Sequence, residues 1–396
     1  MKFEKLISKL ISFKTISEHN NINLLKFIEN YLKKYGVSSK IINYQNGRAN
    51  LYSRIGPDVR GGIILSGHTD VVPTEGQNWK SNPFELKKIN NKLFGRGTSD
   101  MKSFIAIVLS LIPKMVKSDL KKPIDLMFSY DEEIGCVGIQ KAIPFLKEIK
   151  NKSKYCIVGE PTEMNVINQH KGKKNFLVTF EGLEAHSSLI NDGVNAIKYA
   201  TKFITFLSNL EEELKSKNKI DENFSPPYAT INVGKIDGGI ALNIIPKHCT
   251  VEFELRDLPN SNSEILVKRI KKYLFQNLEK EMKLKNKKCY TKFNTTNNFP
   301  PLKVSKNNSL VNLSLRSLNS NKAGTVSFGT EAGVFDKLGI ETLVCGPGSI
   351  KQAHQPNEFI KLDQIDKCEI FIEKIINSFC IHIIEIIIYI KEIFNI

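Results

Sequence analysis

The sequence has no C-x-x-C pair, and its seven cysteines are scattered along the chain. They lie at positions 136, 156, 249, 289, 345, 368 and 380. An odd number of cysteines without paired spacing fits neither a disulfide framework nor a zinc site built on thiolates. We therefore expect reduced, mostly buried cysteines and a cytoplasmic location.

The sequence also has no apolar run of the roughly 20 residues that a membrane-spanning helix needs. The tail 381–396 comes nearest, but Glu385, Lys391 and Glu392 interrupt it, so we expect a terminal helix packed on the body of the protein. Residues 1–17 carry lysines inside an apolar pattern and no small-residue cleavage site, which favours an amphipathic helix over a signal peptide. We expect no membrane partner.

The sequence has fewer acidic than basic residues. It contains 41 Asp and Glu and 57 Lys and Arg, which gives a net charge of +16. Such a charge raises the question of nucleic-acid binding. However, the lysines are spread through stretches rich in Lys, Asn and Ile, and no recognised nucleic-acid-binding motif accompanies them. We therefore expect no nucleic-acid partner.

The chain is ample in length and in apolar residues. Its 396 residues, 41% of them hydrophobic and 25% charged, are typical of a globular protein too long for one ordinary core. No internal repeat divides the chain. Two domains are therefore expected.

One stretch, IILSGHTDVVP at 63–73, joins a buried strand to candidate chemistry. Residues 63–66 predict a buried parallel strand, and Gly67 permits a close turn. His68 and Asp70 lie two residues apart, so in extended backbone they point to the same side. A carboxylate in this position can fix which ring nitrogen faces a metal. The alternative is that Asp70 caps a helix at a strand-to-helix turn.

A second candidate acid, Asp100, ends a long irregular stretch. The loop predicted over 74–98 leads into GRGTSD, and loops of this length in compact domains are often functional. An apolar helix is predicted over Met101–Val116, bent or terminated by Pro113. Either Ser99 or Asp100 could instead serve as the N-cap of that helix.

Further carboxylates follow other predicted strands. Glu132 and Glu133 come after the strand Ile124–Tyr130, and Glu160 comes after the strand Tyr155–Val158. A surface turn would also tolerate such acids. Open α/β sheets, however, place their sites at the carboxyl ends of strands, so the repeated position favours a shared site.

The middle of the chain, residues 175–298, has a different character. Its elements follow the order β-α-β-β-α-β, which predicts a four-stranded antiparallel sheet with two helices, a ferredoxin-like insert. The predicted elements are the strand Phe176–Glu181, a helix over 194–214, strands over 228–235 and 249–255, a helix over 264–278 and a strand over 289–293. The α/β pattern then resumes. The expected fold class is α/β, with a discontinuous domain of mixed sheet and flanking helices over 1–174 and 299–396 and an inserted α+β domain over 175–298.

Two histidines, His68 and His354, accompany the carboxylates. Nitrogen and oxygen donors without cysteine suit zinc or cobalt. The carboxylates are numerous enough for two metals with a shared bridge, an arrangement that two-metal hydrolases use. One glutamate must then stay off the metals to move a proton.

Six motifs, in this order, resemble the M20 metallopeptidase family: SGHTDVVP, GRGTSDMKS, DEEIGCVG, GEPT, EAHSS and GPGSIKQAHQPNEF. The resemblance runs from the N-terminus to about Cys380. Each motif is weak alone, whereas the ordered set is highly specific. It implies a zinc-hydrolase catalytic domain with an inserted lid and dimerisation domain.

The resemblance also implies a metal-binding role for each matching position. By this likeness His68 and Glu160 would bind one zinc ion, and Glu133 and His354 would bind the other. Asp100 would bridge the two. Cobalt is a possible substitute for zinc.

The same resemblance implies the remaining roles. Glu132 would be the general base and acid, and Asp70 would orient His68. His186, in EAHSS, would polarise the substrate carbonyl in the site of a partner subunit, which implies a homodimer through 175–298. Asn243 and Arg256 match positions that contact substrate, although an arginine at a strand end is also a common surface residue.

Three further stretches, HKG at 170–172, PPYATINVGKIDGG and FELRDLP, are similar to those of family members that remove the acetyl group from N2-acetyl-L-ornithine. The expected function is therefore hydrolysis of this small-molecule amide, a step of arginine biosynthesis. Desuccinylation of succinyl-diaminopimelate and hydrolysis of dipeptides stay open as alternatives. A non-catalytic binding protein would be expected to have lost a ligand or Glu132, and neither is lost. The role of His170 does not follow from the sequence.

Overall fold

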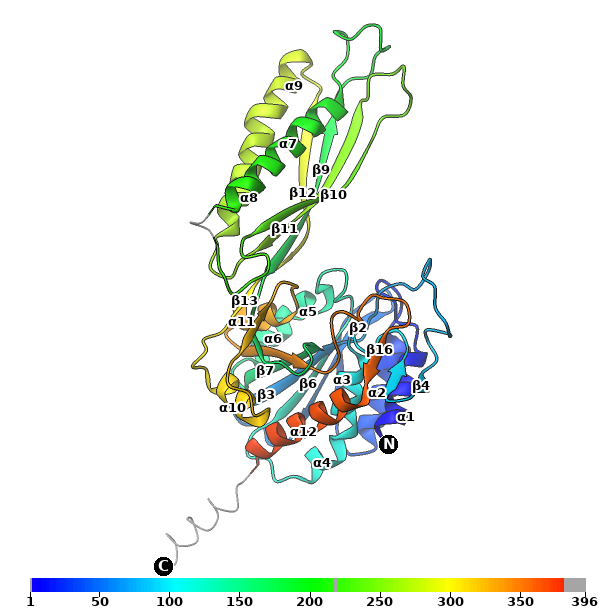
Figure 1. The fold of residues 1–396 in the computed structure, drawn as a ribbon, viewed down its shortest axis with the longest axis vertical. Helices are drawn as coiled ribbons and strands as arrows, with labels where there is room; N and C mark the ends of the chain where they lie inside the picture. Colours follow the sequence, from blue (N-terminus) through cyan, green and yellow to red (C-terminus); the bar gives the residue numbers. More distant parts are fainter. Residues whose placement is uncertain (1, 217–219, 381–396) are drawn as a thin grey trace, which may run out of the picture. The chain divides into compact units, whose positions relative to one another are not determined.

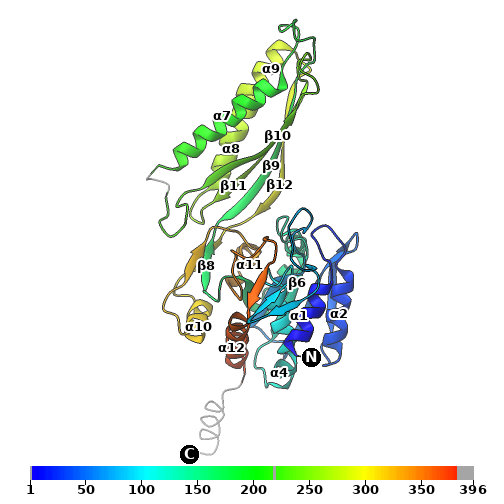
Figure 2. The same cartoon turned by 45° about the vertical axis from the view of Figure 1, so that its right-hand side comes forward.

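The structure, a computed structural model, describes residues 2–216 and 220–380 (Figures 1 and 2). These residues form two compact units. Unit 1 comprises 2–169, 302–325 and 330–380, and unit 2 comprises 170–216, 220–301 and 326–329. The chain therefore leaves unit 1, builds unit 2 and returns. The helix expected over 381–396 lies outside the described residues.

Among the described residues, unit 1 is built on a sheet of nine strands in the order β1-β2-β6-β3-β7-β15-β8-β13, with β14 paired to β8. The four middle strands, β6, β3, β7 and β15, are parallel to one another. Every residue of β3 and β6 is buried, as expected for parallel strands covered on both faces. The strands are β1 (Ser39–Gln45), β2 (Arg48–Ile55), β3 (Gly62–His68), β6 (Ile124–Ser129), β7 (Ser153–Pro161), β8 (Ile167–His170), β13 (Leu302–Lys303), β14 (Gly324–Val326) and β15 (Glu341–Gly346).

Helices cover both faces of this sheet (Figure 1). On one face α3 packs so closely on β7 that a Cβ added to Gly159 would lie 2.0 Å from the ring of Phe104. Helices α1 and α12 pack against α3. On the opposite face Glu331, just before α11, accepts a hydrogen bond from the Ser66 hydroxyl of β3. The helices of unit 1 are α1 (Phe3–Ser12), α2 (Ile22–Lys33), α3 (Lys102–Ser110), α4 (Ile112–Lys117), α5 (Val137–Lys141), α6 (Ile143–Ile149), α10 (Ser309–Ser317), α11 (Ala332–Lys337) and α12 (Leu362–Ser378).

For unit 1, the structure agrees with the break predicted in the helix over 101–116 and differs from the loop predicted over 74–98. The helix predicted over Met101–Val116 is interrupted at Leu111, as expected from Pro113, which lies in the first turn of α4 where a missing N–H costs nothing. The loop predicted over 74–98 is wrong in its last part. There β4 (Lys87–Ile89) and β5 (Lys92–Phe94) form a hairpin, and β16 (Phe359–Lys361) pairs with β5. Asn90 makes the turn with a φ of 52°, a conformation that asparagine tolerates.

The described part of unit 2 contains a four-stranded antiparallel sheet in the order β10-β11-β9-β12. Residues of β9 alternate between buried and half-buried, because helices cover only one face of this sheet. The predicted ferredoxin-like order, and with it the α/β fold class, is confirmed. The elements are β9 (Gly172–Glu181), α7 (Ala196–Leu214), β10 (Thr230–Gly238), β11 (His248–Asp257), α8 (Ser263–Tyr273), a π-helical turn (Leu274–Leu278), α9 (Glu279–Lys285) and β12 (Tyr290–Phe299).

None of the helices in the described parts of the chain combines the length and the apolar character needed to cross a membrane. The seven cysteines are all free thiols, and six of them are buried. The expectation of reduced, mostly buried cysteines therefore agrees with the structure.

Candidate metal centre

The predicted site residues of unit 1 gather at the carboxyl ends of its parallel strands. His68 is the last residue of β3, and Glu160 lies in the last part of β7. The pair Glu132 and Glu133 follows β6 at a distance of three residues, and Asp100 lies two residues before α3. Because these strands are parallel, their carboxyl ends meet at one edge, which is where α/β sheets hold their ligands.

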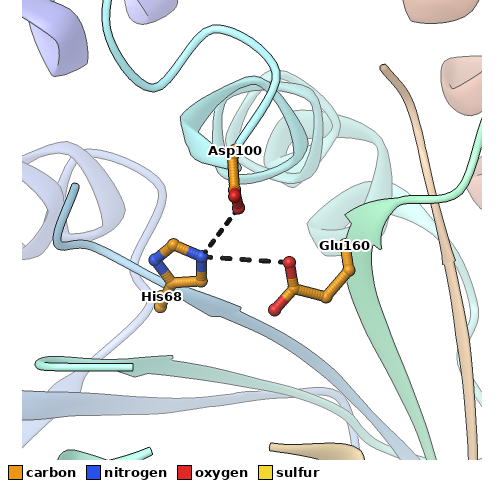
Figure 3. A group of neighbouring side chains, drawn as sticks. All are labelled: His68, Asp100 and Glu160. Carbon is orange, nitrogen blue, oxygen red and sulfur yellow. Dashed lines mark hydrogen bonds and ion pairs between the residues drawn. The ribbon is translucent and has the colours of Figure 1, made fainter. Parts of the chain in front are cut away.

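The first group of candidate ligands consists of His68, Asp100 and Glu160 (Figure 3). The Nε2 atom of His68 lies 3.1 Å from Oδ1 of Asp100 and 3.9 Å from Oε2 of Glu160. All three side chains are buried, with at most 6% of any residue exposed. One imidazole nitrogen and two carboxylates thus converge on a common point.

The second group consists of Asp100, Glu133 and His354. The Nε2 atom of His354 lies 2.9 Å from Oε2 of Glu133 and 3.4 Å from Oδ2 of Asp100. Asp100 therefore offers a different oxygen to each histidine. A carboxylate placed in this way is suited to bridge two cations.

Two buried carboxylate oxygens indicate that the groups fit metal ions. Oε1 of Glu133 and Oε1 of Glu160 are shielded from solvent and have no hydrogen-bond partner among the described residues. A buried polar atom without a partner is costly, and a cation would satisfy it. Asp100 is not occupied as a helix cap, because the N-cap of α3 is Met101 and makes no side-chain capping bond. Donors of this kind, nitrogen and oxygen without sulfur, suit zinc.

Asp70 connects His68 to the turn that follows β6. The Nδ1 atom of His68 lies 3.0 Å from the backbone carbonyl oxygen of Asp70 and 3.5 Å from its Oδ1 atom. The same carboxylate accepts hydrogen bonds from the backbone N–H groups of Glu132 and Glu133, at 3.0 and 3.3 Å, and from the hydroxyl of Ser17. Asp70 therefore holds Nδ1 away from the cluster, so that Nε2 faces Asp100 and Glu160. It does not cap a helix.

Desolvation and crowding shift the pKa values of the two adjacent glutamates. Burial raises the pKa of Glu132 to about 8, the positive charge of His68 opposes the rise, and the charge of Glu133 adds to it. Burial and the charge of Asp100 raise the pKa of Glu133 to about 7. Glu132 also accepts a hydrogen bond from the thiol of Cys136, with 3.2 Å between Sγ and Oε1. A carboxyl group with a pKa near neutrality can both accept and release a proton.

The pKa values of His354 and Asp100, both in the second group, shift in opposite directions. Hydrogen bonds with Asp100 and Glu133 raise the pKa of His354 to about 10. Burial alone would raise the pKa of Asp100, but the hydrogen bonds with His354 and His68 outweigh it and hold that pKa below its usual range. The cluster therefore binds protons where a cation could bind, and cation binding should release them.

The remaining predicted site residues belong to unit 2. His186 and Asn243 lie on two adjacent loop segments, joined by the hydrogen bond from the Ser187 N–H to the Asn243 carbonyl. Both side chains are exposed, and Nδ1 of His186 lies 2.8 Å from the Ser188 hydroxyl oxygen. Arg256 lies near the other end of β11 and pairs with Glu254 at 2.9 Å. The structure thus brings His186 and Asn243 together and separates them from Arg256.

Several buried charged residues around the candidate ligands were not predicted. Glu358 accepts a hydrogen bond from the N–H of Asp100 and forms a buried ion pair with Arg96, and Glu331 accepts hydrogen bonds from Ser66 and Ser129 near the ends of β3 and β6. Glu358 stands four residues after His354 within the motif GPGSIKQAHQPNEF, so a signal for it was present in the sequence. Glu331 had none, because a single acid before a short helix is common.

The comparisons with known proteins define the class. The model of Peptidase family M20/M25/M40 matches residues 64–378, and the chain belongs to this family of hydrolases. A relative from Buchnera aphidicola subsp. Acyrthosiphon pisum (strain Tuc7), named acetylornithine deacetylase, is 32% identical over 390 residues, which cover 96% of this chain and 98% of the relative. A protein of the same name from Pasteurella multocida (strain Pm70) is 31% identical over 389 residues, with the same coverage.

Solved structures support the same fold. An M20 family metallo-carboxypeptidase from Sulfolobus solfataricus superposes with a TM-score of 0.76 at 19% identity, covering 95% of this chain and 98% of that one. A dinuclear metal-binding peptidase of the family from Bacillus subtilis gives a TM-score of 0.63 at 14% identity, with 94% and 96% covered. The predicted family is therefore confirmed by sequence, and the predicted architecture by structure.

Proposed function

We propose that the protein removes the acetyl group from N2-acetyl-L-ornithine, giving L-ornithine and acetate, as a step of arginine biosynthesis in the cytoplasm. The observation that carries the proposal is the pair of candidate ligand groups that share Asp100, together with the neighbouring Glu132, which belongs to neither group. The choice of substrate is supported by relatives named acetylornithine deacetylase that align along 96% of the chain. The free, mostly buried cysteines support the location.

Each residue of the centre has a part in this proposal. His68 and Glu160 would hold one zinc ion, Glu133 and His354 would hold the other, and Asp100 would contribute to both; cobalt could replace zinc. When bound, the ions supply Lewis acidity toward a carbonyl oxygen and toward water. Glu132 takes a proton from the attacking water and later delivers it to the leaving amine nitrogen. Asp70 holds His68 and the backbone of residues 132–133 in position for these steps.

We also propose that the insert over 175–298 is a dimerisation domain and lid, and that 1–174 and 299–396 form the catalytic domain. Among the described residues, the outer strands β10 and β12 each pair with a single neighbour, so each has an open edge that a second copy could cover. In the proposed homodimer His186 reaches the partner's site and holds the carbonyl oxygen of the substrate.

The positions of His186 and Arg256 within unit 2 support a substrate site to which two copies of the chain contribute. His186 lies beside Ile244, in the segment that leads into β11, whereas Arg256 lies eight residues beyond His248, the first residue of that strand. Eight residues of strand extend over about 26 Å. One small substrate is too short to contact both ends of one such sheet. If His186, Asn243 and Arg256 all serve one substrate, they must come from different copies.

A succinylated substrate is the second candidate, since Arg256 could pair with its extra carboxylate. In the structure, however, Arg256 is already paired with Glu254, which also lies 3.4 Å from Lys173. A second substrate carboxylate would have to share the guanidinium of Arg256 with Glu254, so two negative charges would compete for one positive charge. An acetyl group makes no such demand. The pairing therefore favours the acetylated substrate.

The test is a comparison of kcat/KM for acetylornithine, succinyl-diaminopimelate and a dipeptide with the same preparation of zinc-loaded protein. We expect acetylornithine to lead, since one well-placed polar group can discriminate by roughly 10⁴ whereas size alone gives roughly 10–200-fold. A higher kcat/KM for succinyl-diaminopimelate would overturn the proposed substrate. The proposal of a two-metal hydrolase would not be affected. Metal analysis of the same preparation should give about two equivalents per chain.

A further inference from the structure

Glu358 makes a dense set of contacts with the loop that carries Asp100. Its Oε1 atom accepts hydrogen bonds from the backbone N–H groups of Ser99, at 2.7 Å, and Asp100, at 3.1 Å. Its Oε2 atom accepts hydrogen bonds from the N–H of Gly97, at 3.0 Å, and from Nη1 of Arg96, at 2.7 Å. Every strong acceptor position of this carboxylate is thereby used, and Glu358 is only 1% exposed.

Arg96 extends these contacts toward His354. Its guanidinium is also 1% exposed, and Nη2 donates to Oε1 of Gln77 at 2.6 Å. The amide nitrogen of Gln77 in turn donates to the backbone carbonyl of His354 at 2.9 Å. The ring of Trp79 lies 5.1 Å from the guanidinium carbon and covers it. A continuous chain of hydrogen bonds thus runs from Asp100 to His354.

The backbone at His354 needs such support. Its φ is 63°, in the left-handed region that residues other than glycine seldom occupy, and its side chain is half exposed. A residue in this conformation keeps it only where surrounding contacts hold it. The hydrogen bond from Gln77 to the carbonyl of His354 is such a contact, and it depends on the orientation that Arg96 gives to Gln77.

We infer that Glu358, Arg96 and Gln77 are positioning residues that hold the backbone of Asp100 and the backbone of His354 at a fixed spacing for metal binding. This inference rests on the proposed metal centre and adds to it the part of the chain that assembles the second ligand group. Residues that fix metal ligands through hydrogen bonds contribute strongly to affinity, because a ligand that must first be ordered binds less tightly. Replacing Glu358 should therefore weaken metal retention in a protein that remains folded.

The test measures metal retention in the full-length, zinc-loaded protein by titration with EDTA. For Glu358→Gln we expect half of the zinc to be lost at an EDTA concentration about 10–100-fold lower than for the unmodified protein. Gln77→Ala, at a half-buried position, should move that concentration in the same direction by a smaller factor, because only the support of His354 is removed.

Asp125→Asn is the matched control. Asp125 is also a fully buried carboxylate paired with an arginine, since its two oxygens each lie 2.8 Å from nitrogens of Arg54. It stands near the start of β6, at the sheet edge opposite the metal centre. Its replacement should lower the melting temperature and leave the EDTA concentration unchanged.

The outcomes separate the inference from the proposed function. If the unmodified protein holds no stoichiometric metal, the proposed function fails. If it holds metal and Glu358→Gln behaves like Asp125→Asn, the inference alone is overturned. Should Glu358→Gln not fold, Gln77→Ala decides, and unchanged metal retention in that variant overturns the inference as well.

Discussion

Glu132 is the residue whose chemistry can be separated most cleanly from metal binding. It stands next to the proposed ligand Glu133 but belongs to neither ligand group. We expect Glu132→Gln to keep its zinc and to lose roughly 10²–10⁴ in kcat, the usual contribution of general acid–base catalysis. Turnover and bound metal should be measured on the same sample.

Glu133→Ala is the companion variant, because it removes a candidate ligand one residue away. It should lose metal as well as activity. Turnover close to that of the unmodified protein in Glu132→Gln, or metal loss equal in the two variants, would contradict the assignment of roles.

His170 offers a second residue-scale prediction, since the structure points to a role in stability. Burial lowers the pKa of His170 to about 4, from a usual value near 6.5. Its Nδ1 donates to the carbonyl of Lys171, and its Nε2 has no partner within the described chain. The folded protein therefore holds a neutral ring, whereas the unfolded chain takes up a proton once the pH falls below about 6.5.

Stability should consequently decrease as the pH falls. Between pH 7 and pH 5, the contribution of His170 to the free energy of unfolding should drop by about 2 kcal/mol. Urea unfolding of the metal-free protein and of metal-free His170→Gln across this range isolates the effect. The variant should show the shallower dependence on pH, and parallel curves would rule out a buried neutral ring.

At the scale of helices and strands, sequence patterns located the long elements and missed the short ones. The strands β3, β6 and β7 each contain a short apolar run, at 63–65, 126–128 and 155–158, and β9 shows regular alternation. The strands β4, β5 and β16 have three residues each, too few to show a period. The pairing of β16 with β5 also joins Phe359 to Phe94, which are 265 residues apart in sequence. Local patterns carry no information on such distant partners.

The same limit applies to the metal centre. His68, Asp100 and the acids after β6 could be proposed from the sequence because each follows a strand or loop at the same edge of one sheet. Glu358 acts on Asp100 across 258 residues of chain, and Gln77 acts on His354 across 277. Only the folded chain brings these pairs together, so their function emerges from tertiary contacts.

At the scale of the whole molecule, the proposed homodimer makes a quantitative prediction. His186→Ala should lower turnover by about 10²–10³, the usual loss for one donor to a developing oxyanion. If His186 acts in the partner's site, mixing this variant with Glu132→Gln should restore activity once subunits exchange. Each mixed dimer then has one intact site, and a random mixture should reach about a quarter of the original activity.

Two controls accompany the mixing experiment. Light scattering must give the mass of a dimer, and differently tagged subunits must be shown to exchange. Failure to regain activity after proven exchange would place His186 in the site of its own subunit.

The order of strands in the main sheet has a consequence for synthesis of the chain on the ribosome. Strand β15 lies between β7 and β8, yet its residues are made after the whole of unit 2. Until residue 346 has emerged, β7 lacks one of its two neighbours and exposes a row of unpaired backbone groups. His354, only eight residues later, closes the second ligand group. Unit 2 can begin to fold before β15 is made, whereas metal can fill both groups only after residue 354 has emerged.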